Sequence, residues 1–153
     1  MISLYHLFEN DNSKFPNYTR LVKIMKSFNF PIDQYYIISS GSLAAHGIRD
    51  CNDFDVTCKS ELWNKIKNKY PANEKVGRGI LLHSNPEIET FNDDYPPLKY
   101  TYKDILSRME RADIIDGIKF ESLPDVLEWK RRMGREKDLK DIELIKTYIK
   151  SGG

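Results

Sequence analysis

Apolar residues recur along the chain with the spacing of helices in some segments and of strands in others. In residues 18–28, YTRLVKIMKSF, an apolar side chain falls at i, i+3, i+4 and i+7, which predicts an amphipathic helix. In residues 60–70, Ser60 is the predicted cap and Pro71 the stop of a second helix. Further helices are predicted over residues 102–112, 123–133 and 136–150. Four apolar residues of the last helix are predicted to face the core: Leu139, Ile142, Ile145 and Ile149.

Strand patterns lie between these helices. The run YYIISS, residues 35–40, is aromatic and β-branched, and DFDVT, residues 53–57, alternates polar with apolar positions. A short helical segment, SLAAHG, separates these two runs and ends at Gly47. Residues 79–91 predict two strands joined by a turn at residues 84–86, and residues 114–122 predict a hairpin around Asp-Gly.

The order of the elements predicts an α+β fold, a small mixed β-sheet flanked by helices. Residues 1–153 are expected to form one domain, since 153 residues bury a single core. Residues 1–16 form a weakly patterned N-terminal arm, and residues 122–150 form a helical C-terminal part.

Charge and composition narrow the function classes. The chain has 24 basic and 23 acidic side chains, so its formal net charge of +1 argues against extended tracking along nucleic acid. No run approaches a membrane span, and the first residues lack the pattern of a secretory signal, so a soluble, cytoplasmic protein is expected. Cys51 and Cys58 suggest neither a disulfide framework nor a zinc site.

The candidate chemistry lies in GSLAAHGIRDCNDFDV, residues 41–56. Side chains alternate along a strand, so Asp53 and Asp55 are predicted to share one face while Phe54 points to the core. Two carboxylates so placed suit Mg²⁺, which prefers oxygen ligands and bridges to substrate phosphates. Gly41 would let a phosphate approach the backbone, and Ser42 would open a helix whose free N–H groups attract an anion. Taken singly, an Asp-x-Asp at a strand end is common and is usually a surface feature.

The combination resembles the signature of the nucleotidyltransferase superfamily, the DNA polymerase β-like fold. That signature joins Gly-Ser, an acidic pair in a strand and a third acidic residue on a later strand. The stretch IETF is similar to the later-strand element, which makes Glu89 the candidate third carboxylate and Glu87 its rival. The C-terminal GREKDLKDIELIK resembles a segment of small stand-alone members, including those related to abortive-infection and toxin–antitoxin systems. The resemblance spans residues 35–150.

The resemblance implies transfer of a nucleoside monophosphate from an NTP, such as ATP, to an acceptor hydroxyl. Asp53, Asp55 and Glu89 would be the catalytic and metal-binding residues for Mg²⁺ or Mn²⁺, with Glu89 a candidate general base. Gly41 and Ser42 would hold the β and γ phosphates. The acceptor is left open among a small molecule, a protein side chain and an RNA end.

Several other residues have two interpretations each. Arg49, Arg135 and Lys137 are candidate nucleotide-binding residues. A structural or solvated role is equally open for Arg49, and Arg135 and Lys137 belong to a mixed-charge stretch typical of a solvated helix face. His46 and Trp129 fit structural positions better than ligand contacts. Tyr95 and Tyr100 are candidates to line an acceptor pocket, although a plain loop around Pro96 and Pro97 accounts for them better.

Two other function classes remain open. A chain that keeps this fold and its nucleotide affinity without turnover would be a binding or regulatory module. A chain in which the two aspartates are incidental would be a structural interaction protein. The position of the third carboxylate separates the enzyme from the module.

Overall fold

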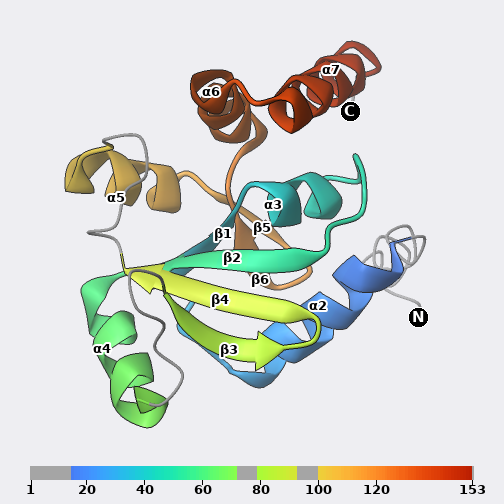
Figure 1. Ribbon diagram of the computed structural model, residues 1–153. Helices are drawn as coiled ribbons and strands as arrows, with labels where there is room; N and C mark the ends of the chain where they lie inside the picture. The colour runs from blue at the N-terminus through green and yellow to red at the C-terminus, as the bar shows by residue number, and fades with distance from the viewer. Residues whose placement is uncertain (1–14, 72–78, 93–99, 153) are drawn as a thin grey trace, which may run out of the picture.

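A six-stranded mixed sheet carries the Asp-x-Asp motif on one of its central strands (Figure 1). The computed structural model of the protein describes residues 15–71, 79–92 and 100–152. Within them the strands are β1 (Tyr35–Ile38), β2 (Asp53–Cys58), β3 (Ile80–Ser84), β4 (Glu87–Asn92), β5 (Asp113–Ile115) and β6 (Ile118–Phe120). Their order in the sheet is β3-β4-β2-β1-β6-β5. The sheet is mixed because β2 runs parallel to β4 and antiparallel to β1, and β1 runs parallel to β6.

Six helices lie in the same described ranges. They are α2 (Pro16–Ser27), α3 (Ser40–Ala45), α4 (Ser60–Lys69), α5 (Tyr102–Glu110), α6 (Leu123–Met133) and α7 (Glu136–Lys150). Local sequence sets several of their ends: the Thr101 hydroxyl accepts a hydrogen bond from the Asp104 amide at the start of α5, and Gly134 ends α6 in the left-handed conformation. Among the described helices, none has the length and apolar character needed to cross a bilayer.

Strand alternation divides the side chains of β2 between the two faces of the sheet. Phe54 and Val56 are fully buried in the main core, together with apolar residues of α2 and α4. Asp55 pairs with Ile38 of β1, and directly paired residues project from the same face of a sheet. Over β1 this second face is covered by α5, whose Ile105 packs with Tyr36. The carboxylates of β2 therefore lie on the face opposite the main core.

The helical C-terminal part packs on α3. Leu43 of α3 is fully buried in a separate apolar cluster with Val126 of α6 and Ile145 of α7. Figure 1 shows α6 and α7 beyond α3, on the far side from α4. The segment between β1 and β2 thus links the sheet to the two last helices.

The predicted α+β class and the mixed sheet are confirmed, and the turn at residues 84–86 and the Asp116–Gly117 hairpin lie where expected. Two finer predictions are wrong. Ser60 is the first residue of α4 and Lys59 occupies the cap position. On α7, Ile142 and Ile145 are buried, but Leu139 and Ile149 are about half exposed, because the apolar stripe is wider than the surface that covers it.

Gly41 lies inside α3 against the sheet. A Cβ on Gly41 would lie 2.7 Å from Ile37 Cγ2 and 2.9 Å from Phe54 Cδ1, and both neighbours are fully buried. Glycine is required here for close packing of the helix on the strands.

We expect Gly41→Val to lower the free energy of unfolding by about 3 kcal/mol, because overpacking a filled core forces its neighbours to move. Lys140→Val on the exposed side of α7 is the matched control and should cost less than about 1 kcal/mol, the helix-propensity difference alone. Urea unfolding of both variants measures the difference. Equal losses would show that the space around Gly41 is not restrictive.

Candidate functional site

A cavity of about 390 Å³ lies where the carboxylate-bearing face of the sheet meets the C-terminal helices. Ser39, between β1 and α3, and Ser40, the first residue of α3, line it, and β2 contributes Asp53 and Asp55. Residues on or next to α6 and α7 line the opposite side: Trp129, Lys130, Met133, Arg135, Lys137 and Asp141. The end of β1 and the loop before β2 add Ile38, Arg49 and Asn52. The cavity therefore joins parts of the chain that are more than 70 residues apart in sequence.

The two aspartates of β2 lie together on this lining, as alternation predicts. Burial raises the pKa of Asp53, the negative charge of Glu87 raises it further, and the positive charge of Lys137 opposes both. The Asp53 carboxylate is thus in a place where a cation would lower its electrostatic free energy.

The two candidates for the third carboxylate, Glu89 and Glu87, lie beside the aspartates in the sheet. In the parallel pairing of β2 with β4, Glu87 is opposite Asp53 and Glu89 is opposite Asp55, which puts all four on one face. Glu89 is fully buried, and neither glutamate is among the residues that line the cavity. In residues 15–71, 79–92 and 100–152, no three His, Cys, Asp or Glu side chains gather closely enough to form a metal site. The structure therefore offers a two-aspartate site with Glu89 next to it.

Basic residues line the cavity from the other side. Arg135 and Lys137, at the start of α7, were predicted to contact nucleotide, and both line it. The guanidinium of Arg135 donates to the Asp138 carboxylate, with Nε 2.6 Å from Oδ2. Lys137 is exposed and close enough to Asp53 to affect the pKa of that carboxyl group. These residues are not simply a solvated helix face.

Arg49, the third predicted nucleotide-binding residue, also lines the cavity, and it is ion-paired. Its Nε and Nη2 donate to the two oxygens of Asp141 at 2.7 and 2.8 Å. This bidentate pair joins the loop before β2 to α7. Arg49 therefore has a structural partner, which was one of its two interpretations.

Lys130 is a cavity residue that the sequence did not reveal. Its side chain is only 4% exposed, and its Nζ lies 2.9 Å from Asp141 Oδ2 and 3.6 Å from Asp138 Oδ1. The signal that was available is its spacing: Leu123, Val126 and Lys130 occupy i, i+3 and i+7, one stripe of α6. The stripe was not recognised because Lys130 lies at the start of a stretch of basic and acidic residues that is typical of an exposed helix face.

Gly41 and Ser42, the predicted phosphate-binding pair, are not among the residues that line the cavity. Gly41 packs on Ile37 and Phe54, and the Ser42 hydroxyl is fully buried and donates to the Glu121 carbonyl. Ser39 and Ser40 line the cavity in their place, because α3 begins at Ser40 and the Gly-Ser pair falls inside the helix. The structure gives Gly41 and Ser42 a packing role.

Three aromatic residues were candidates for a structural role or for an acceptor pocket: Trp129, Tyr100 and Tyr95. Trp129 was predicted to be a core residue; it packs on Tyr100, with ring centroids 6.0 Å apart, and it also lines the cavity. Tyr100 is buried in the cluster under α5 rather than open to an acceptor. Tyr95 lies outside the described residues.

Ser42, His46 and Asp113 form a chain of contacts that resembles a hydrolase triad. His46 Nδ1 lies 3.3 Å from Ser42 Oγ, and His46 Nε2 lies 2.9 Å from an Asp113 oxygen. The hydroxyl is fully buried and its proton is engaged by the Glu121 carbonyl, so no substrate carbonyl can reach it. These contacts are structural, as was expected for His46.

Comparisons of the chain with family models, with curated proteins and with solved structures gave no match. The resemblance to nucleotidyltransferases therefore rests on the residues of the sequence motif alone.

We expect Asp141→Asn to lower the free energy of unfolding by about 3 kcal/mol at neutral pH, because it leaves the buried Lys130 ammonium without its nearest carboxylate. Burial tends to raise the pKa of Asp141, but hydrogen bonds from Arg49 and Lys130 outweigh burial and hold the pKa below its ordinary value of 3.8. The carboxylate therefore stabilises the folded state above pH 4, and this contribution is lost as the pH falls through the lowered pKa.

Urea unfolding from pH 7 down to pH 3 measures the effect of Asp141→Asn, and Asp33→Asn, at an exposed position, is the matched control. The difference between wild type and Asp141→Asn should shrink below pH 4. A difference that is absent at pH 7, or equal to that of the control, would contradict the stabilising role of the network.

Proposed function

We propose that the cavity binds a nucleoside triphosphate with Mg²⁺ or Mn²⁺ and that the protein transfers the nucleoside monophosphate to an acceptor hydroxyl. The observation that carries the proposal is the lining of one cavity by a pair of aspartates from β2 and by Arg135 and Lys137. A carboxylate pair next to cationic side chains suits a metal-bound polyphosphate.

The residues present fit a divalent cation. Asp53 and Asp55 supply hard oxygen donors from adjacent positions on one strand face, and burial and the charge of Glu87 raise the pKa of Asp53. Mg²⁺ is commonly held by one or two carboxylates, with waters and substrate phosphates filling the remaining positions. A cation bound there would neutralise charge on the triphosphate and orient it for in-line attack.

The basic residues would bind the phosphates. Lys137 is exposed on the cavity side at the start of α7 and can approach a phosphate oxygen as a point charge. Arg135 presents the remaining donors of its guanidinium beyond those used by Asp138. The apolar part of the lining, Ile38, Trp129 and Met133, would face the base.

A binding or regulatory module without turnover is the second candidate function. The observation that favours it is the burial of Glu89, the candidate general base, outside the cavity lining. Nucleotide binding requires only the two aspartates and the basic residues, whereas transfer also requires a group that accepts the proton of the acceptor hydroxyl. Both candidate functions include nucleotide binding, and only the enzyme would transfer the nucleoside monophosphate to an acceptor.

Asp55→Asn tests the metal–nucleotide site. We expect wild type to bind at least one NTP only in the presence of Mg²⁺, and Asp55→Asn to weaken that binding by about tenfold or more, because an amide is a poorer ligand for Mg²⁺. Asp33→Asn, an exposed aspartate outside the cavity, should bind as wild type does. Calorimetric titration with each NTP measures the affinities, and wild-type binding that is absent or indifferent to Mg²⁺ would contradict the proposal.

Lys137→Ala tests the phosphate side of the cavity. Loss of one exposed ammonium should weaken the affinity for a triphosphate by about fivefold, and the affinity for the corresponding monophosphate by less. Lys140→Ala, on the same helix and outside the lining, is the control. An equal loss of triphosphate affinity in the two variants would show that the Lys137 ammonium acts only through the overall charge of the protein.

A further inference from the structure

Ser39, which lines the cavity, has a backbone conformation that serine rarely adopts. Its φ of 58° and ψ of −124° lie in a region that glycine occupies readily and that crowds the Cβ of other residues. Such residues persist only where surrounding contacts hold them. Some other part of the protein must therefore fix the turn between β1 and α3.

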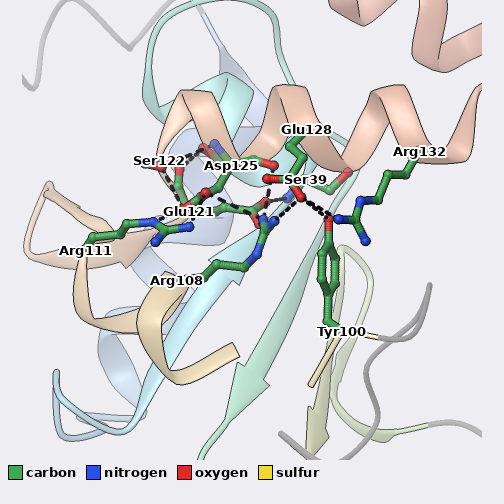
Figure 2. A network of polar contacts seen from close by, with 10 residues as sticks. Ser39, Tyr100, Arg108, Arg111, Glu121, Ser122, Asp125, Glu128 and Arg132 are labelled. Carbon is green, nitrogen blue, oxygen red and sulfur yellow. Dashed lines mark hydrogen bonds and ion pairs between the residues drawn. The ribbon is translucent and has the colours of Figure 1, made fainter. Parts of the chain in front are cut away.

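Glu121, 82 residues further along the chain, makes those contacts (Figure 2). Its side-chain Oε1 accepts a hydrogen bond from the Ser39 amide at 3.2 Å. Its own amide donates to the Ile37 carbonyl at 2.8 Å, and its carbonyl accepts from the Ser42 hydroxyl. Three groups of Glu121 thus bond to residues before, at and after the turn.

Glu121 is itself fixed from the opposite side. Its Oε2 lies 3.6 Å from Nη1 of Arg108, and both side chains are more than 90% buried. Arg108 is held in turn by Glu128, at 2.9 Å, and by the Tyr100 ring, whose centroid is 4.1 Å away. Burial raises the pKa of Glu121 to about 7, while the Ser39 hydrogen bond and the Arg108 charge act in the opposite direction. The buried carboxyl group is thus hydrogen-bonded to the turn on one side and paired with Arg108 on the other, as burial of such a group requires.

We propose that Glu121, braced by Arg108, is a positioning residue that holds the Ser39–Ser40 turn in its strained conformation and so shapes the cavity wall. The inference rests on the proposed function only where it concerns nucleotide affinity; the conformation of the turn is independent of any ligand. Glu121 does not line the cavity and would act through the turn.

The test compares Glu121→Leu, which removes the acceptor at similar volume, with Glu121→Gln, which keeps a side-chain oxygen for the Ser39 amide. We expect hydrogen exchange of the Ser39 amide to speed up by about tenfold or more in Glu121→Leu and to stay near wild type in Glu121→Gln. Affinity for Mg²⁺–ATP should fall by about tenfold in the first variant and be retained in the second. If Glu121→Leu does not fold, the double variant Arg108→Leu/Glu121→Leu, which removes both partners of the buried pair, is measured instead.

Ser39→Gly supplies a rescue that a purely structural role of Glu121 would not produce. Because glycine adopts this conformation without steric cost, Ser39→Gly in the Glu121→Leu background should restore most of the lost affinity. Unchanged Ser39 exchange in Glu121→Leu, or failure of Ser39→Gly to restore binding that Glu121→Leu has lost, would overturn the inference. If wild type binds no nucleotide, the proposed function fails, while Ser39 exchange still decides whether Glu121 holds the turn.

Discussion

The site depends on the carboxylate of Asp141, which lies between two cations. Asp141 accepts a bidentate pair of hydrogen bonds from Arg49 and stands 2.9 Å from the buried Lys130. The first contact ties α7 to the loop before β2, and the second ties α7 to α6. Because these helices supply one side of the cavity, the ion pairs determine how far Arg135 and Lys137 stand from the aspartates. Removing one partner of such a pair costs stability because the other charge stays buried without it, even where the intact pair adds little net stability.

A second buried network sets the other edge of the cavity. Arg108 and Glu121 hold the Ser39–Ser40 turn, and the same Arg108 contacts Glu128 of α6 (Figure 2). The two networks therefore meet on α6, where Glu128 belongs to the Arg108 network and Lys130 to the Asp141 network. Arg108, Glu121, Lys130 and Asp141 are buried, and buried charged groups must keep their partners, so both networks restrict how α6 can shift relative to the sheet.

The sequence predicted the features that follow from local periodicity. Alternation was enough to put Asp53 and Asp55 on one face, and the Asp-Gly pair was enough for the hairpin between β5 and β6. The burial of Glu89 depends on the pairing of β2 with β4, which is set by contacts between distant segments. The burial of Lys130 depends likewise on how α6 docks. The sequence could not separate two roles for Gly41. Glycine is needed both where the backbone packs closely on core side chains and where it binds a phosphate, and the structure shows the first.

Mn²⁺, as a paramagnetic probe, can show whether Asp53 and Asp55 hold a divalent cation against a nucleotide contacted by Lys137. Amide resonances of the ¹⁵N-labelled protein are recorded during a Mn²⁺ titration with and without ATP. We expect broadening centred on residues 53–55 that strengthens with ATP and extends to residue 137, while Asp33 is unaffected. Broadening that is absent around residues 53–55, or that is centred elsewhere on the chain, would contradict this expectation.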